Sequence, residues 1–386
     1  MGEFRALWLA QVLSVAGDQL ARVALTLLVF DRTHSALLAA VTFAASVVPT
    51  FFGGIVLAGL ADRLPRREVM IACDLIRMVL VGVMALSGVP TAVLVVLLFG
   101  VTMTGAPFLS ARAALYPDIL TGDRYVLGTA VTLTTLQFAQ VLGFAVGGAA
   151  VGFFGVRTSL LADAATFALS AVIIRVWVRS RPAAKQATRG GSQARGDMLA
   201  GVRLVFTDPA LRTPMLLGWL AAFYNVPEGV SAPLGAALGG GAVTVGLILA
   251  SQALGASVGA IAFSRLVAPA ERPRWMNPLA IGACGVLVLF VFRPVLPATL
   301  ALLCLSGLFD CYQIAANAQF VNAAPVAQRS TAFGLALGGM SLGQGAAMVA
   351  AGAAAQHIPP SEVVAASGAI GVLCAVLIAM SHGKKR

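Results

Sequence analysis

Charge is scarce in this sequence. Charged residues make up only 11% of its 386 residues, whereas hydrophobic residues make up 59% and the mean hydropathy is +0.92. A soluble domain carries charge on about a quarter of its residues. Without that charged shell, most side chains must face lipid or other helices. The composition therefore excludes an ordinary soluble protein and predicts an integral membrane protein.

Cysteine and histidine are scarce too, and neither shows metal-ligand spacing. All the cysteines lie in apolar runs without a CxxC pair, and the histidines lie far apart near predicted helix ends: Cys73, Cys284, Cys304, Cys311, Cys374, His34, His357 and His382. We expect small buried cysteines and no metal site. No Ser or Cys nucleophile has a plausible base and no GxxxxGK[ST] loop is present, so we expect neither an enzyme nor ATP hydrolysis, and no cofactor.

Long apolar runs are abundant instead, each long enough to cross a bilayer as a helix. No cleavable signal peptide is evident. Charges, Pro and Gly divide the runs into twelve predicted transmembrane helices: 5–30, 35–61, 68–87, 91–115, 126–153, 158–179, 213–236, 242–267, 277–293, 297–320, 330–354 and 361–381.

One long polar stretch, residues 181–212, divides these helices six and six. It is rich in Arg, Gly and Ser, and we interpret it as a cytoplasmic linker with an amphipathic helix near 196–206. The predicted domains are therefore an N-terminal six-helix bundle (1–180), the linker, and a C-terminal six-helix bundle (213–386).

The basic residues indicate the orientation. With a cytoplasmic N-terminus, most of the 26 Lys and Arg residues lie on the inner side, and only Arg32, Arg157 and Arg293 lie outside. This is a strong positive-inside signal. We therefore expect a multi-pass protein of the inner (plasma) membrane with both termini cytoplasmic, a monomer whose partner is the lipid bilayer. The net charge of +11 then reflects topology and not nucleic-acid binding.

The two halves resemble each other at offsets that cluster near 205 residues. Three short segments in the first half match segments about 205 residues later, such as Asp62-Arg-Leu and Ser264-Arg-Leu. The similar offsets indicate a duplicated six-helix unit. Parallel repeats of this kind place a substrate site at the repeat interface, near the middle of the bilayer.

The loop after the second predicted helix carries a recognisable motif. Ala58-Gly-Leu-Ala-Asp62-Arg63-Leu-Pro65-Arg66-Arg67 resembles motif A of the major facilitator superfamily, G-x-L-a-D-R-x-G-R-R, in the loop where that family carries it. With Asp74-Leu-Ile-Arg77, Ala111-Arg112 and Phe167-Ala-Leu-Ser, the chain resembles the drug-exporter and secretion-effector branch, which includes macrolide and siderophore exporters.

A second motif lies on the fifth predicted helix. Gly143-Phe144-Ala-Val-Gly147-Gly148 resembles the antiporter motif C, G-x-x-x-G-P-x-x-G-G, with Phe144 at the Pro position and Ala139 at the first Gly. Small residues at this spacing let helices approach closely. The missing Pro keeps an uptake transporter open as an alternative.

The resemblance implies a fold and a gate. The fold is an all-α membrane protein of twelve transmembrane helices in two pseudo-symmetric six-helix bundles. The gate is a cytoplasmic network of charge pairs that holds the outward-facing state and lies apart from the substrate. It is formed by Asp62, Arg63, Arg66, Arg67, Asp74, Arg77 and Arg112.

Charges inside the predicted helices are functional candidates because a charge in the bilayer is costly. Asp18 lies near the middle of the first helix, with Arg22 one turn later on the same face. Two interpretations stay open: a self-neutralising ion pair between these residues, or a carboxylate that takes up and releases a proton.

Asp310 is the other deep carboxylate, with Gln313 and Asn317 on the same face of the tenth helix. No basic residue lies within four positions, so it must be protonated, exposed to water or paired across helices, and we favour a functional role. On the seventh helix, Glu228 and Asn225 flank Pro227, which we expect to kink the helix. Glu228 either binds cations or protons or meets water at the outer mouth.

Other polar and aromatic residues complete the predicted cavity. The resemblance implies that helices 1, 4, 7 and 10 line the cavity, with helices 2, 5, 8 and 11 beside them. The polar and aromatic residues on these helices that we expect in the cavity are Gln137, Gln252, Gln344, Phe223 and Tyr224. Each of them also fits a role in helix packing. Asp163 on the sixth helix reads as a structural hydrogen-bonding residue.

These observations predict a secondary transporter, a proton-coupled exporter of amphipathic or cationic small molecules that works by alternating access. The proton gradient would supply the energy. The first alternative is an uptake symporter or uniporter on the same fold. The second is a membrane scaffold or sensor that transports nothing. The presence of Asp18 and Asp310, carboxylates near the middle of the predicted membrane spans, argues against it.

Overall fold

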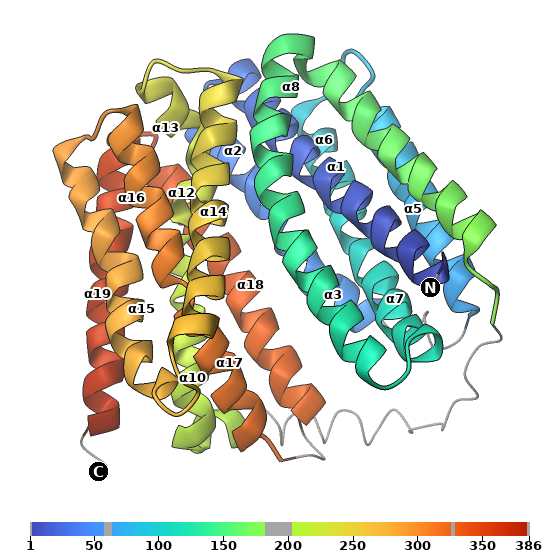
Figure 1. The fold of residues 1–386 in the computed structure, drawn as a ribbon. Coiled ribbons are helices and arrows are strands. Elements are labelled where there is room, and N and C mark those ends of the chain that lie inside the picture. The colour runs from blue at the N-terminus through green and yellow to red at the C-terminus, as the bar shows by residue number, and fades with distance from the viewer. Residues whose placement is uncertain (1, 58–63, 182–202, 326–328, 384–386) are drawn as a thin grey trace. The chain divides into compact units, whose positions relative to one another are not determined.

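The chain is described by a computed structural model over residues 2–57, 64–181, 203–325 and 329–383. All regular secondary structure in these residues is helical (Figure 1), which confirms the predicted all-α class. Residues 182–202 of the predicted linker lie outside the described residues. Of its proposed helix, 196–206, residues 203–206 are described and are helical.

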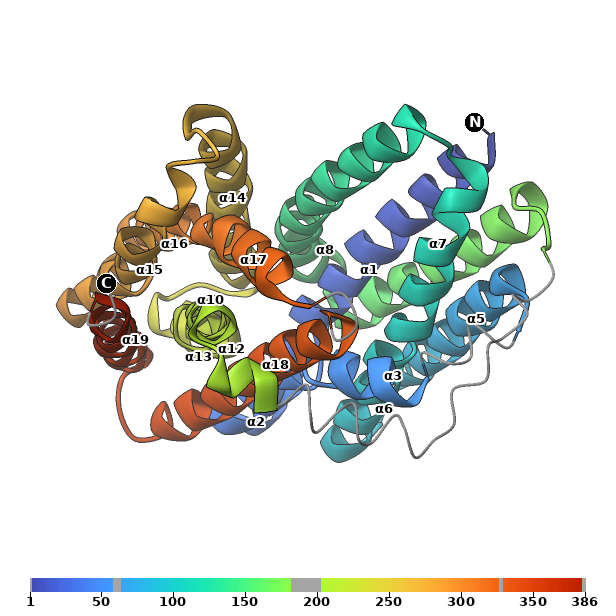
Figure 2. The ribbon, with the colours of Figure 1, turned by 90° about the horizontal axis from the view of Figure 1, so that it is seen from below.

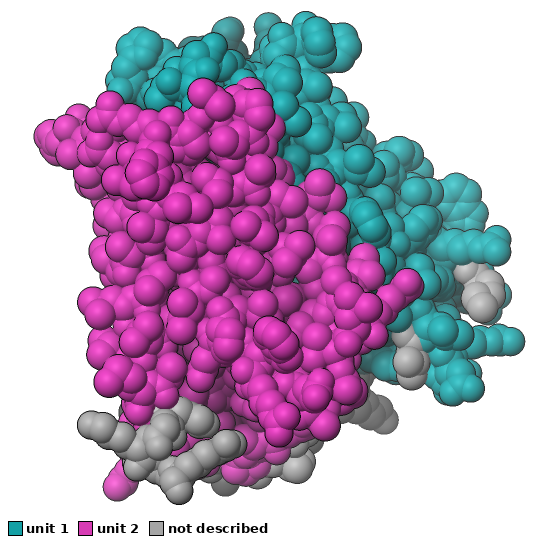
Figure 3. All heavy atoms as spheres, turned by 60° about the vertical axis from the view of Figure 1, so that its left-hand side comes forward, with its two compact units in different colours: residues 1–186, 231–250 teal, residues 187–230, 251–386 magenta. Residues whose placement is uncertain are grey.

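The chain forms two compact units, coloured separately in Figure 3. Unit 1 contains residues 1–186 together with 231–250, and unit 2 contains residues 187–230 and 251–386. Residues 231–250 follow the linker in sequence, yet they pack with the first half of the chain.

Unit 1 is built around a long first helix, α1, which packs along most of α8 (Figures 1 and 2). Its helices are α1 (Gly2–Thr33), α2 (Ala36–Ala44), α3 (Pro49–Val56), α5 (Arg66–Met84), α6 (Thr91–Met103), α7 (Gly105–Ile119), α8 (Asp123–Trp177), α13 (Ser231–Ala237) and the start of α14 (Ala242–Leu266).

Local sequence explains where several of these helices begin and break. Ser35 caps α2 by accepting a hydrogen bond from the Leu38 backbone N–H at 3.2 Å. Pro49 begins α3, as expected for a residue that lacks an N–H to donate. Gly155, with φ of 79°, divides α8 into two helices at the gap predicted between 153 and 158.

Unit 2 contains more interrupted helices. It consists of α10 (Pro209–Trp219), α11 (Ala221–Tyr224), α12 (Val226–Gly229), the rest of α14, α15 (Arg272–Val288), the 3₁₀ turn η1 (Leu289–Phe292), α16 (Leu296–Phe309), α17 (Tyr312–Ala323), α18 (Arg329–Ala354) and α19 (Pro360–Gly383). Helices α15 and α19 pack along each other.

Two predicted helices of the C-terminal half are therefore not continuous. The predicted helix 213–236 is a series of four short helices, with one break at Asn225 just before Pro227. The predicted helix 297–320 is interrupted at Asp310 and Cys311, between α16 and α17. The expected kink beside Pro227 is confirmed. Asp310 does lie in the middle of the apolar span Leu296–Ala323, but at a break between two helices and not within a continuous one.

Nine helical segments within the described residues are long and apolar enough to cross a membrane. One of them, α8, contains two of the predicted spans on either side of Gly155. The charges Glu68, Asp74 and Arg77 distinguish α5 from these nine, and α10 to α13 are individually short. The membrane architecture is confirmed, and the full set of twelve is not counted directly.

Glycine allows the closest helix contacts of unit 1. A side chain at Gly147 would meet the Leu20 backbone of α1 at 3.0 Å. One at Gly148 would meet the backbone of α14 at Gly246 at 2.7 Å. The small residues of the motif-C segment therefore bring the first half of α8 against both α1 and α14, as predicted from their spacing.

Candidate functional site

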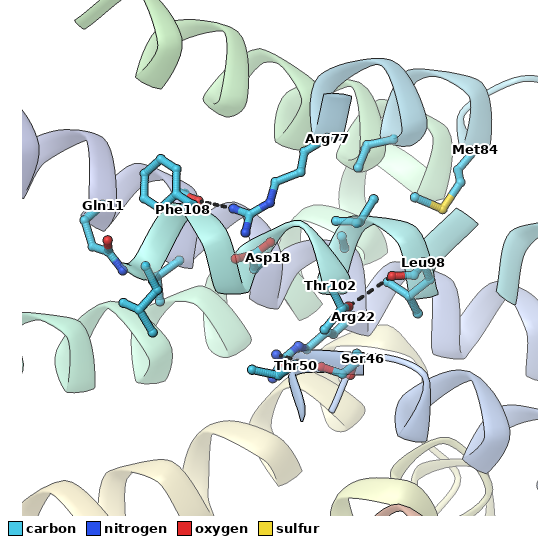
Figure 4. Close-up of a pocket in the computed structure, with 17 residues that line it drawn as sticks. Gln11, Asp18, Arg22, Ser46, Thr50, Arg77, Met84, Leu98, Thr102 and Phe108 are labelled. Carbon is cyan, nitrogen blue, oxygen red and sulfur yellow. Dashed lines mark hydrogen bonds between the residues drawn. The ribbon is translucent and has the colours of Figure 1, made fainter. Parts of the chain in front are cut away.

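A polar cavity of about 160 Å³ lies inside unit 1 (Figure 4). Five helices and the segment after α2 enclose it, and the charged residues among its lining are one aspartate and two arginines. The lining comprises Gln11, Ser14, Val15, Asp18, Ala21, Arg22, Ser46, Thr50, Arg77, Val81, Met84, Leu98, Val101, Thr102, Gly105, Phe108 and Leu109.

Asp18 lies between Arg22 and Arg77 in this cavity (Figure 4). Arg22 donates from Nη2 to the carbonyl oxygen of Ser46 at 3.1 Å. No ion pair within 4.0 Å joins Asp18 to either arginine in the described structure. The self-neutralising pair between Asp18 and Arg22 is therefore not formed, because Arg22 is held by the turn that follows α2.

Arg77 is fixed by weak polar contacts and by aromatic rings. It donates to Ser14 Oγ and to Thr104 Oγ1, both at 3.3 Å. Its guanidinium also lies 5.4 Å from the ring centres of Phe108 and Phe167, within range of a cation–π attraction. The expectation that Arg77 belongs to a separate inner cluster is wrong, because its side chain lines the same cavity as Asp18.

Asp74 and Arg112 are both buried and have different partners from those expected. Asp74 Oδ2 accepts a hydrogen bond from Ser170 Oγ at 2.6 Å. Arg112 lies 5.5 Å from the ring centre of Tyr116, and its Nε and Nη1 have no hydrogen-bond partner among the described residues. The motif-A residues Asp62 and Arg63 lie outside the described residues.

The other two arginines of motif A stabilise one end of unit 1. Arg66 forms a 2.6 Å ion pair with Asp118 and also donates to the carbonyl of Ala114 at 2.8 Å. Arg67 pairs with Glu68 at 2.8 Å and donates to the carbonyl of Val178. The start of α5 is thereby bonded to the end of α7 and to the residue that follows α8.

Unit 2 contains a second polar centre, where two interrupted helices meet. The hydroxyl of Tyr224, at the end of α11, donates to the carboxylate of Asp310 at the break after α16. Gln313 Nε2 donates to the same Tyr224 hydroxyl at 2.9 Å and to the carbonyl of Gly218 at 3.1 Å. Of the three states predicted for Asp310, pairing across helices is the one observed.

Gln252 connects this centre to α14. Its Nε2 donates to the Tyr224 carbonyl at 3.0 Å and to Asn225 Oδ1 at 2.8 Å. These bonds satisfy the backbone at the point where the predicted seventh helix is interrupted. Tyr312 adds a further tie, because its hydroxyl donates to the carbonyl of Leu217 at 2.8 Å.

A cavity of about 280 Å³ lies beside this centre in unit 2. Gln313 and Asn317 supply its polar groups, and the rest of the lining is mostly apolar: Pro214, Met215, Gly218, Trp219, Ile314, Ala316, Phe320, Phe333, Ala336, Leu337 and Met340.

The remaining predicted cavity residues are dispersed. Gln137 is exposed, Gln344 is half-buried, and neither lines these two cavities. Phe223 packs toward Gly371 of α19 and Glu228 lies in α12. Within the described residues, no group of three His, Cys, Asp or Glu side chains could hold a metal ion.

Sequence reasoning missed the hydroxyl partners of the buried charges. Ser170 belongs to the Phe167-Ala-Leu-Ser segment, which was informative only through its resemblance to other sequences. Tyr224 was expected to add aromatic surface, whereas it is buried and bonded to Asp310. The available signal in the sequence was the Tyr224 hydroxyl on an otherwise apolar helix. That signal does not identify the distant acid to which the hydroxyl is bonded.

Comparisons with known proteins support this architecture. A family model described as Major Facilitator Superfamily matches residues 7–231 and 229–385. The enterobactin exporter EntS of Shigella boydii is 25% identical over 300 residues, which cover 75% of this chain and 71% of that protein. The multidrug efflux pump Tap of Mycobacterium tuberculosis is 26% identical over 316 residues, which cover 78% and 74%.

Solved structures agree at the level of the fold. A POT family transporter in complex with a thioalcohol-conjugated peptide has a TM-score of 0.80 at 10% identity and covers 99% of this chain and 96% of its own. A bacterial homolog of the human lysosomal transporter Spinster has a TM-score of 0.72 at 15% identity and covers 98% and 94%. The family match extends over nearly the whole chain, and the chain therefore belongs to the Major Facilitator Superfamily.

Proposed function

We propose that this chain is a proton-coupled exporter of amphipathic or cationic small molecules that works by alternating access. The observation that carries the proposal is Asp310, a carboxylate inside the membrane, bonded to Tyr224 where two interrupted helices meet. A change of charge at such a break alters a bond between two helices, which gives protonation a direct mechanical consequence.

Export is supported by the relatives. EntS is named as an enterobactin exporter and Tap as a multidrug efflux pump, and both match over about three quarters of this chain. The mostly apolar cavity of unit 2, with only amide groups for polarity, suits the apolar part of an amphipathic molecule. In this proposal the protein is a monomer in the plasma membrane with both termini cytoplasmic, and the proton gradient is its energy source.

Uptake by a symporter or uniporter is the second candidate, because one feature of the antiporter motif is absent. Phe144 stands where motif C has Pro, and it lies buried within the first half of α8. Direction of transport therefore has to be measured and not read from the motif.

The test uses the purified full-length protein in liposomes that contain a pH-sensitive dye. An imposed proton gradient is combined with ethidium, tetraphenylphosphonium and a panel of uncharged natural-product drugs. We expect compound-dependent proton movement in wild type that is lost in Asp310→Asn and retained in Asp123→Asn, which changes an exposed acid in the first turn of α8. Exchange of a compound without any proton movement would overturn the antiporter and leave a uniporter.

A further inference from the structure

Asp163 is a fully buried acid of unit 1, and the mechanism proposed above does not use it. It lies in the second half of α8 and its exposed fraction is 0%. Its Oδ2 has no hydrogen-bond partner among the described residues. An ionised carboxylate with an unpaired oxygen in such a place is costly. The site therefore favours a neutral, protonated carboxyl group. From the sequence alone, we expected Asp163 to be a structural hydrogen-bonding residue.

The Asp163 carboxyl group faces α1 at Gly17, the residue directly before Asp18. A side chain at Gly17 would collide with Asp163 Oδ1 and would lie 3.2 Å from its Cγ. Glycine thus makes room for the carboxyl group against the backbone of α1. The charged groups that act on Asp163 are Asp18 of α1 and Arg77 of α5.

The Thr166 hydroxyl, which neighbours this carboxyl group, also fits a protonated acid. Thr166 Oγ1 donates to the Asp163 backbone carbonyl at 2.7 Å and lies 3.3 Å from Asp163 Oδ1. A hydroxyl has one hydrogen and two lone pairs. The shorter contact uses that hydrogen, so the threonine oxygen remains able to accept a hydrogen from the carboxyl group.

Charge balance points the same way. The interacting groups inside unit 1 are three acids, Asp18, Asp74 and Asp163, and two arginines, Arg22 and Arg77. Arg112 lies apart, over the ring of Tyr116. If all five groups were ionised, the cluster would carry one excess negative charge. A single bound proton makes the cluster neutral.

We propose that Asp163 is a second proton-binding site, placed behind Asp18 and separated from the cavity by α1 at Gly17. In one state the proton is on Asp163 and Asp18 is a carboxylate between the two arginines. In the other state the O–H bond at Asp163 is broken and an O–H bond at Asp18 is formed, so that the proton reaches the cavity. The inference rests on the proposed proton coupling, and it identifies Asp163 as the site that holds the proton before it is transferred to Asp18.

The direct test measures proton binding without any substrate. Infrared difference spectra of the full-length protein in lipid, recorded across a pH change, report the C=O band of protonated carboxyl groups. Asp310→Asn is the background, so that unit 2 does not contribute. We expect a protonated-carboxyl band that persists in Asp18→Asn, disappears in Asp163→Asn and returns at a changed frequency in Asp163→Glu.

Two further results decide the role. Asp118→Asn serves as the matched control, because that acid lies in the Arg66 ion pair and should leave the band unchanged. In the native background, ethidium-driven proton movement should fall at least severalfold in Asp163→Asn and recover in Asp163→Glu. A band that survives in Asp163→Asn, or a band that is lost while proton movement keeps its rate and pH profile, overturns the inference.

The proposed function can fail separately. If no compound drives proton movement in wild type, the proposed proton-coupled export is wrong. The infrared band still tests whether Asp163 binds a proton. If wild type couples and Asp163→Asn couples equally well, the inference alone is wrong.

Discussion

Between the helices of unit 1, the carboxyl groups of Asp18, Asp74 and Asp163 share the interior with the guanidinium groups of Arg22 and Arg77. Between the helices of unit 2, Asp310 is bonded to the phenol of Tyr224 and thereby linked to the amide of Gln313. The basic residues of unit 2 lie near the predicted ends of its spans, and its apolar helices carry none in their middle.

The two arrangements predict different responses of the two units to protonation. In unit 1 the charge of any one acid is shared with several neighbours, so that protonation is a property of the cluster. In unit 2 the change in charge is confined to one carboxylate and one hydrogen-bond chain, at a place where two helices are already interrupted. We therefore expect substitutions in unit 2 to act all-or-none and substitutions in unit 1 to act by degrees.

The largest expected effect is that of Asp310→Asn compared with Asp18→Asn. Because no neighbouring acid in the chain of bonds can replace Asp310, proton movement should fall by roughly tenfold or more, equivalent to ~1.4 kcal/mol on the barrier. Asp18→Asn should reduce it less, since Asp74 and Asp163 remain. Dye-loaded liposomes measure proton movement in both variants. A larger loss in Asp18→Asn than in Asp310→Asn would contradict the expected difference between the units.

The next effect concerns packing, in which the two units are alike. Helix α14 approaches α8 at Gly246 in unit 1 and α16 at Gly255 in unit 2, where an added side chain would collide with the backbone carbonyl of Cys304. Gly246→Val and Gly255→Val should each destabilise the protein by about 1–3 kcal/mol because backbones must separate. Thermal unfolding in detergent measures this. Gly82→Ala, with open space around it, is the control and should leave the melting temperature nearly unchanged.

A smaller effect is expected for Tyr224→Phe. The variant keeps the ring and removes the hydroxyl that joins Asp310 to Gln313, which should cost ~1 kcal/mol of stability, the scale of one hydrogen bond in a membrane protein. The pH profile of proton movement should shift as well, because the carboxylate loses its donor. Asp74 offers the counterpart in unit 1: Ser170→Ala removes its donor and should shift the profile less. An equal shift of the pH profile in Tyr224→Phe and Ser170→Ala would contradict the expectation that the change in charge in unit 2 is confined to Asp310.

The smallest effect should follow from Arg66→Gln at the end of unit 1. The Arg66–Asp118 pair is partly exposed, and such pairs contribute about 0.2–1 kcal/mol. Unfolding in low and high salt should show a small difference for wild type that disappears in the variant. A loss of coupling as large as that of Asp310→Asn would instead give this pair a role in transport.

Much of the fold was predictable because apolar length and charge asymmetry are properties of local sequence. The break at Gly155 and the kink beside Pro227 followed from single residues. The interruption at Asp310 did not, because it is stabilised by a bond to Tyr224, 86 positions away. No periodicity within the tenth predicted helix encodes that partner.

The candidate site was predictable in its acids and not in their partners. A charge inside an apolar run is visible in the sequence, so Asp18 and Asp310 were identified. The spacing of Asp18 and Arg22 favoured a local ion pair, but the Ser46 carbonyl, on a turn 24 residues later, holds Arg22 instead. The assignment of Arg77 to a separate cluster failed for a similar reason, since its long side chain reaches Ser14.

Residues 231–250 have a consequence for how the protein is made. Unit 1 includes this segment, and Gly246 supplies one of its closest backbone contacts. On the ribosome, the first six predicted helices emerge long before residue 250 does, so unit 1 cannot be completed until part of the second half has been synthesised. Expression of the chain as two fragments cut within the linker would leave the N-terminal fragment without its last packing surface. Recovery of folded protein should then depend on both fragments being inserted into the same membrane together.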